Sequence, residues 1–120
     1  MPTIEDAIAL ATEAHRGQTR PDGTPFILHP LRVMLSLRDD LDRVAAALHD
    51  VVEDSAITLA DLRARGYEPA VVEAVDHLTR REGESYEAFV ERIAPHPRAR
   101  RTMMRSCASR YPPSWPSSWG

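Results

Sequence analysis

The sequence predicts an all-α domain of about six helices followed by an irregular C-terminal tail, and three observations support this fold class. No segment alternates apolar and polar residues as a half-buried strand would. Helix-capping residues repeatedly precede stretches in which apolar residues recur at helical spacing. The 120 residues are 42% hydrophobic and 28% charged, which is the composition of one globular domain.

The first two helices flank a loop rich in glycine and proline. Thr3 can cap a helix that ends before Gly17. Residues 17–28 hold two glycines and two prolines, so we expect them to form a loop. Pro30 suits the first turn of a second helix, which we expect to extend to about Leu37.

The remaining four helices are bounded by capping residues, prolines and a glycine. Asp40, Thr58 and Ser85 are the capping residues, and Pro69 suits a first turn. We expect the four helices between Asp40 and Asp54, between Thr58 and Gly66, from Pro69 to about Leu78, and from Ser85 to Pro95.

The charge of the chain is divided unevenly along its length. With 9 arginines and 18 acidic residues, residues 1–91 carry a formal charge of −9, whereas the six arginines of residues 92–120 leave +6. The acidic main body argues against nucleic acid as the primary partner. No apolar run approaches the roughly 20 residues of a membrane span, and the first residues lack the basic region of a signal peptide. We therefore expect a cytoplasmic protein without a membrane partner.

The predicted third helix carries an apolar stripe and an opposite stripe of ionisable residues. At about 100° per residue, His49, Asp50, Glu53 and Asp54 fall on one side, and the apolar residues of 41–52 fall on the other. Three carboxylates on one face repel one another unless water or a cation screens them. The stripe is therefore either a solvated helix face or part of a cation site.

A cation site explains this stripe better than a solvated face does. Residues 44–52 read VAAALHDVV, which is too apolar for a helix that lies loosely on the surface. His49 and Asp50 point about 100° apart, so both can reach one ion only if another part of the chain completes its shell. His29, which Pro30 restricts, is the candidate for the additional ligand.

Three segments in order resemble the hydrolase domain of the RelA/SpoT family, which belongs to the HD superfamily. They are AHRGQTRPDGTPFILHPLRV at 14–33, AALHDVVED at 46–54 and TLADL at 58–62. Residues 78–93 also resemble the small single-domain bacterial members. The resemblance implies an all-helical HD domain at residues 1–101. It implies a phosphohydrolase that removes the 3′-diphosphate from guanosine tetra- and pentaphosphate with one divalent cation, usually Mn²⁺.

The resemblance also implies roles for five of the candidate site residues. His29, His49 and Asp50 would bind Mn²⁺ or another divalent cation. Glu53 and Asp54 match the acidic pair that positions and deprotonates the attacking water. A divalent ion lowers the pKa of bound water, and a carboxylate one turn further along the helix is placed to accept its proton.

The other candidate polar residues carry weaker signals. Arg20 matches a loop arginine that packs against the guanine base, although a solvated loop charge is the alternative. Pro21 stands where family members often carry a second basic residue, so the resemblance leaves the base open. His15, His77 and His96 have no acidic cluster at ligand spacing, and we expect structural or exposed roles for them.

The C-terminal segment departs from the family. Members continue into a helix that supplies a fourth metal ligand, an Asp, and an Asn that contacts the nucleotide, whereas residues 102–120 contain no Asp, Glu or Asn. We interpret residues 102–120 as an atypical tail that is frame-shifted or otherwise altered; the alternative is a natural subunit whose missing ligand comes from a partner. Because residues 102–120 lack the apolar periodicity of the family's final helix, we expect the groove in which that helix lies to be uncovered. This favours a homo-oligomer, in which Tyr111, Trp115 and Trp119 would cover apolar surface.

Two classes of function remain open. The first is an enzyme that releases pyrophosphate from (p)ppGpp, with the hydrolysis of another nucleotide phosphate as its variant. The second is a degenerate HD-fold module that binds a nucleotide with weak or no turnover. Intact Glu53 and Asp54 favour the enzyme, and the missing fourth ligand favours the binding module.

Overall fold

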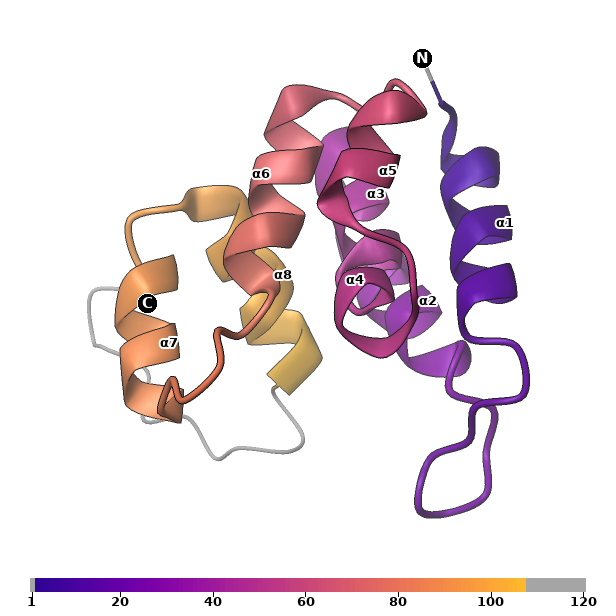
Figure 1. Cartoon of the computed structure of the whole chain (residues 1–120), viewed down its shortest axis with the longest axis horizontal. Helices are drawn as coiled ribbons and strands as arrows, with labels where there is room; N and C mark the ends of the chain where they lie inside the picture. The colour runs from indigo at the N-terminus through magenta and orange to yellow at the C-terminus, as the bar shows by residue number, and fades with distance from the viewer. Residues whose placement is uncertain (1, 108–120) are drawn as a thin grey trace.

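The computed structural model describes residues 2–107, which form eight α-helices and no β-strand (Figure 1). This confirms the predicted all-α fold class. None of the helices in this part of the chain has the length and apolar character needed to cross a bilayer. The helices are α1 (Ile4–Ala14), α2 (Leu28–Leu35), α3 (Asp40–Leu48), α4 (Val51–Asp54), α5 (Leu59–Ala64), α6 (Pro69–Leu78), α7 (Tyr86–Ile93) and α8 (Pro97–Cys107).

Helix α3 lies at the centre of the fold, and α1, α2, α6 and α8 pack against it (Figure 1). Its residues 45–48 are fully buried. Three of them are alanines, whose small side chains let neighbouring helices approach closely on more than one side. A helix that is apolar on most of its surface must be enclosed in this way, as the VAAAL run predicts.

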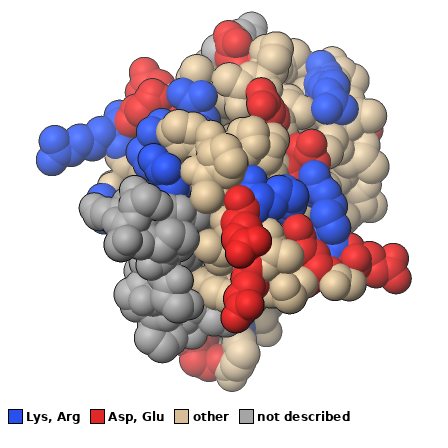
Figure 2. Space-filling model, turned by 90° about the vertical axis from the view of Figure 1, so that its left-hand side faces the viewer, with Lys and Arg blue, Asp and Glu red and all other residues tan. Residues whose placement is uncertain are grey.

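Side chains form two hydrophobic clusters. The larger cluster joins α1, α2, α3, α5 and α6. The smaller one joins the end of α6 to α7 and α8, and it consists of Leu78, Phe89, Val90, Ile93, Ala99 and Met103. On the face of the molecule that carries α7, acidic and basic side chains are interspersed (Figure 2).

Most of the predicted helix starts are confirmed by their caps. Thr3 and Thr58 each form a capping box with the aspartate three residues later, which satisfies backbone donors that the first turn leaves free. Ser85 caps α7 through the backbone N–H of Ala88. Pro69 occupies the first turn of α6, where its missing N–H has no cost.

The predicted third helix is wrong in one respect, because the chain breaks it in two after Leu48. The Ala46 carbonyl accepts hydrogen bonds from both the backbone N–H and the imidazole Nδ1 of His49. A side chain that competes for a backbone carbonyl in this way disturbs the helical pattern. His49 and Asp50 therefore lie in a turn, and α4 begins at Val51.

The sixth predicted helix ends before Pro95 as expected, but the chain then forms a further helix that was not predicted, because α8 extends from Pro97 to Cys107. A proline in the first turn is compatible with a helix start. Residues 99, 102 and 103 are buried at helical spacing, so the boundary expected between residues 101 and 102 falls inside a packed helix. The remainder of the predicted tail, residues 108–120 with Tyr111, Trp115 and Trp119, lies outside the described residues.

A buried carboxylate anchors α8 to α3. Asp42 is only 2% exposed. Arg98 Nε donates to its Oδ1 at 2.8 Å, and Arg101 Nε donates to its Oδ2 at 2.7 Å. A buried charge is tolerated only when partners satisfy it, so this contact explains why an arginine-rich segment packs as a helix against the core.

Candidate functional site

The three predicted ligands converge at one point. His29 lies in the first turn of α2, and His49 and Asp50 lie in the turn between α3 and α4. Asp50 Oδ2 is 3.1 Å from His49 Nε2 and 3.8 Å from His29 Nε2. The break after α3 makes this convergence feasible, because an unbroken helix would hold His49 and Asp50 about 100° apart.

The donor set fits a divalent cation. Ligand atoms bound tetrahedrally at about 2.0–2.1 Å lie roughly 3.4 Å from one another, and the separations of 3.1 and 3.8 Å bracket that value. The side chains of His29, His49 and Asp50 are 11%, 5% and 18% exposed, so little water competes for them. Their nitrogen and carboxylate donors suit Mn²⁺, Zn²⁺ and similar ions.

Ionised Asp50 favours binding of a cation, whereas at His49 the cation must displace the proton that a raised pKa favours. Burial by itself would raise the pKa of Asp50, but the adjacent His49 lowers that pKa to about 2. Burial would lower the pKa of His49, and the Asp50 carboxylate more than offsets this effect, so the pKa of His49 is raised. The His49 Nδ1–H donates to the Ala46 carbonyl, which leaves Nε2 facing the site and fixes the orientation of the ring.

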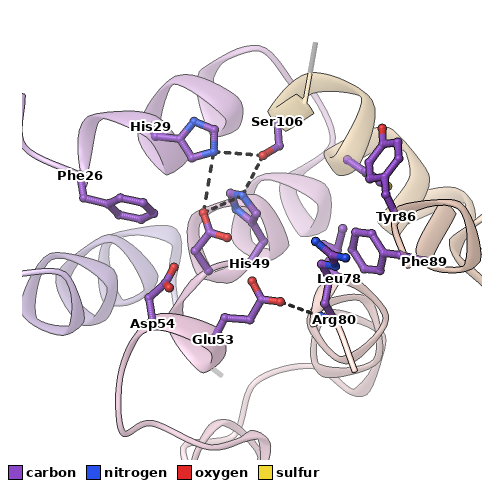
Figure 3. A pocket seen from close by; sticks show the side chains of 12 residues that line it. Phe26, His29, His49, Glu53, Asp54, Leu78, Arg80, Tyr86, Phe89 and Ser106 are labelled. Atoms are coloured by element: carbon purple, nitrogen blue, oxygen red, sulfur yellow. Dashed lines mark hydrogen bonds and ion pairs between the residues drawn. The ribbon is translucent and has the colours of Figure 1, made fainter. Parts of the chain in front are cut away.

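Ser106 is the functional candidate that the sequence analysis missed. Its hydroxyl oxygen lies 3.0 Å from His29 Nε2 and 3.2 Å from His49 Nε2 (Figure 3). It reaches the site from the last turn of α8. The spacing of Ala99, Thr102, Met103 and Ser106 on one helix face is the signal that could have found it.

The two predicted catalytic carboxylates lie beside the metal ligands. Glu53 and Asp54 line the same pocket as His29, His49 and Asp50. The backbone N–H of Arg80 donates to Glu53 Oε1 at 2.6 Å, so a residue after α6 holds the carboxylate in place. Gln18 donates to the backbone carbonyl of Asp54 at 2.8 Å.

Glu53 has the properties of a base. Desolvation raises its pKa, the hydrogen bond from Arg80 opposes that effect, and the negative charge of Asp50 adds to it, with a net increase. A carboxylate with a raised pKa binds a proton more readily, which suits proton transfer near neutral pH.

The pocket is lined in part by Leu78, Phe89 and Met103 of the smaller hydrophobic cluster and has a volume of about 290 Å³. Figure 3 shows Phe26 on one side and Tyr86 and Phe89 on the other, with His29, His49 and Ser106 between these sides. Aromatic side chains offer flat apolar surfaces on which a ligand ring can stack. The pocket thus combines a candidate cation site, two carboxylates and aromatic walls.

Arg20 lies outside this pocket, in a neighbouring one. The second pocket shares His29 and Ser106 with the first. Three more arginines line it with Arg20, namely Arg32, Arg101 and Arg105. A concentration of guanidinium groups next to a cation site is suited to several phosphate groups at once.

The remaining three histidines lie at two different places in the structure. His15 is 2% exposed and packs against Phe26, with ring centroids 4.6 Å apart, and its Nδ1 contacts Gln18 Oε1 at 3.0 Å. This agrees with the expected packing role at a helix end. His77 and His96, by contrast, lie against each other, which their distance in the sequence did not indicate.

The fold and this site define a helical domain with a candidate metal site, and the comparison with family models gives its class. The chain belongs to the HD domain family, whose model matches residues 7–109. The convergence of His29, His49 and Asp50 is consistent with the metal dependence of HD-domain hydrolases.

Several relatives carry names connected with guanosine polyphosphates. A guanosine-3′,5′-bis(diphosphate) 3′-pyrophosphohydrolase of Vibrio cholerae is 40% identical over 81 residues, which is 64% of this chain and 11% of that protein. The bifunctional (p)ppGpp synthase/hydrolase SpoT of Escherichia coli K12 is 43% identical over 63 residues, which is 49% of this chain and 9% of that protein. The chain thus spans about a tenth of the length of these two relatives.

A solved structure supports the fold. The structure of a metazoan ortholog of SpoT that hydrolyses ppGpp superposes with a TM-score of 0.74 at 23% identity. The match covers 99% of this chain and 79% of the metazoan chain. The chain therefore shares the helical arrangement of that structure.

Proposed function

We propose that this chain is a metal-dependent phosphohydrolase that removes the 3′-diphosphate from guanosine polyphosphates and releases pyrophosphate. The observation that carries the proposal is the convergence of His29, His49 and Asp50 in a pocket that also holds Glu53 and Asp54. The names of the relatives support the guanosine polyphosphate as substrate. We propose Mn²⁺ as the working ion.

In this reaction a water oxygen bonds to the phosphorus that carries the ribose 3′ oxygen, and the bond from that phosphorus to the 3′ oxygen breaks. A divalent cation in the site would stabilise phosphate charge and lower the pKa of water. Glu53 accepts the proton that water loses, because its pKa is raised and its carboxylate lies in the pocket. Asp54 orients the water from the same turn, and the proton finally resides on the 3′ oxygen.

The two neighbouring pockets suggest how the substrate is held. The 3′-diphosphate lies at the histidines, and the other phosphate groups lie toward the arginine-lined pocket that contains Arg20. Guanidinium groups bind phosphate oxygens in pairs and also stack on flat rings. Arg20 therefore contributes to substrate binding through phosphate, through the base, or through both.

A second candidate is a nucleotide-binding module with weak turnover, and one observation favours it. Ser106 presents a neutral hydroxyl to His29 and His49. A hydroxyl is a weaker ligand for a divalent cation than a carboxylate is. If binding of the cation is weak, the same pocket would hold the nucleotide without hydrolysing it efficiently.

The experiment that decides between these functions measures pyrophosphate released from guanosine tetraphosphate by the full chain, with and without Mn²⁺. If the chain is the proposed hydrolase, it should release pyrophosphate and guanosine diphosphate in equal amounts, and EDTA should abolish this release. Nucleotide binding without release of pyrophosphate would favour the binding module. Parallel assays with other nucleotide phosphates test the choice of base.

A matched pair of variants controls for contamination and folding. His49→Gln removes one nitrogen ligand and should abolish the Mn²⁺-dependent release. Glu91→Gln changes an exposed carboxylate on α7 outside the site pocket and should leave the release unchanged. Equal rates in both variants would refute the proposed site.

A further inference from the structure

Three potential ligands meet at a second place, remote from the pocket described above. Glu73 and His77 lie one turn apart on α6, and His96 lies in the turn between α7 and α8. A ligand atom from each side chain lies within 4.8 Å of the others. The imidazole centroids of His77 and His96 are 3.4 Å apart. None of the three residues lines the pocket of His29.

Local hydrogen bonds orient His77 for metal binding. Its Nδ1 lies 2.7 Å from the backbone carbonyl of Glu73, a contact in which Nδ1–H is the donor. The lone pair of Nε2 is then available to a ligand. Metal-binding histidines characteristically donate their other ring N–H to a carbonyl or carboxylate in this way, because it fixes the tautomer and the ring orientation.

The backbone holds His96 in a defined position. Its N–H donates to the Ile93 carbonyl at 2.8 Å, and its own carbonyl accepts from Arg100 N–H at 2.9 Å. Pro95 and Pro97 flank it and restrict the backbone on both sides. Little conformational freedom is therefore lost when the imidazole binds a ligand.

Among the described residues, the arginines close to Glu73 do not form ion pairs with it. Arg98 and Arg101 line the same surface pocket as Glu73, His77 and His96. Both of these arginines are engaged with Asp42. Within residues 2–107 the Glu73 carboxylate has no ion-pair partner.

We propose that Glu73, His77 and His96 form a second metal site, for a divalent transition ion of the Zn²⁺ class. Two imidazoles and one carboxylate are donors that such ions prefer to the all-oxygen sets of Ca²⁺ and Mg²⁺. Three protein ligands leave a fourth position for water. This proposal is independent of the proposed hydrolase activity.

The position of the site gives metal binding a structural consequence. An ion at this site joins α6 to the start of α8, and α8 carries Ser106 to the first site at its other end. Because the ion binds only the folded chain with this geometry, it stabilises the docked position of α8. The second site thus supports the helix that closes the first.

Calorimetric titration of the full chain with Zn²⁺ tests the proposal. The first site is removed by the double change His29→Gln and Asp50→Asn, which leaves one expected equivalent of bound Zn²⁺ per chain. Adding His96→Gln to this background should weaken the remaining Zn²⁺ affinity. The loss should exceed the about 10- to 100-fold that follows when a residue that only orients a ligand is removed. Adding Glu91→Gln instead should leave the affinity unchanged.

Two further measurements keep the test informative if a histidine variant folds poorly. Glu73→Gln changes an exposed side chain and should lower the Zn²⁺ affinity while the circular dichroism spectrum stays the same. Zn²⁺ should raise the Tm of the background variant, and both Glu73→Gln and His96→Gln should reduce that increase. If the background variant binds no Zn²⁺, or binds it equally well with Glu73→Gln and with His96→Gln, the proposal is overturned.

Discussion

The hydroxyl of Ser106 lies 3.0 Å from Nε2 of His29, 77 residues earlier in the chain. It also lies 3.2 Å from Nε2 of His49, so α8 closes the candidate metal site with a neutral oxygen. The resemblance to the RelA/SpoT family implies that an aspartate of the final helix supplies a fourth ligand. Because residue 106 supplies a hydroxyl in place of a carboxylate, a substitution of Ser106 is expected to change the affinity of the site for a cation.

Ser106→Asp should strengthen Mn²⁺ binding by about tenfold or more, because carboxylate oxygen is a better ligand for Mn²⁺ than a hydroxyl. The same change should lower the Tm of the metal-free protein, since it places a second negative charge near Asp50. Calorimetric titration and thermal unfolding with and without Mn²⁺ measure the two effects. Ser106→Ala is the control, and a Mn²⁺ affinity equal in both variants would show that residue 106 does not face the ion.

Glu53→Gln should reduce turnover of guanosine tetraphosphate by about 100-fold or more, which is the loss expected for a general base. The amide keeps the size of the side chain and the contact with Arg80 N–H but cannot accept the proton. Mn²⁺ affinity should change little, because Glu53 is not among the three ligands that converge. The matched control is Glu87→Gln on the exposed surface of α7.

Asp54→Asn should also reduce turnover while the fold is retained, since Asp54 is exposed at the mouth of the pocket. A loss smaller than that of Glu53→Gln is expected if Asp54 orients the water without accepting its proton. Steady-state rates for the two variants and for the double variant test this order. Wild-type rates in both single variants would assign the pair to a solvated helix face.

Asp42→Asn should destabilise the protein by about 2–3 kcal/mol, because it removes charge-assisted hydrogen bonds from Arg98 and Arg101 to a buried carboxylate. The change should also weaken Mn²⁺ binding, since α8 carries Ser106. Urea unfolding gives the first quantity. Asp39→Asn is the control: its side chain is 46% exposed, asparagine also caps helices, and a loss below about 1 kcal/mol is expected.

Glu84 predicts a specific dependence of stability on pH. The hydrogen bonds from Arg92 are the main reason that its pKa falls from 4.5 to about 2. A folded-state pKa below the unfolded-state pKa means that ionised Glu84 contributes stability above about pH 4.5 and loses it as the pH falls toward 2. The Glu84→Gln variant should therefore be less stable than the wild type at pH 7. Its free energy of unfolding should change less than that of the wild type between pH 4.5 and 2. Glu13→Gln, whose pair with Arg16 is mostly exposed, should follow the wild type.

The sequence by itself determined the all-α fold and most helix starts, and it pointed to the three candidate metal ligands that the structure brings together. Helix caps such as Thr3, Thr58 and Ser85 act within three residues, so their signal is local and can be read along the chain. His49 and Asp50 were candidates because the ionisable stripe lies opposite the apolar stripe of the same predicted helix, and His29 was the candidate ligand from another part of the chain. The resemblance to the RelA/SpoT family pointed to the same residues.

Only the tertiary structure decided where α3 breaks, that residues 97–107 form a helix, and which side chains meet there. The sequence of α8 alone would predict that its arginines are solvated. Arg98 and Arg101 instead donate hydrogen bonds to the buried carboxylate of Asp42, which lies 56 residues before Arg98. The same docking brings Ser106 to His29 and His96 to His77. These contacts depend on packing between distant helices, and no local periodicity encodes a partner that is more than a few turns away.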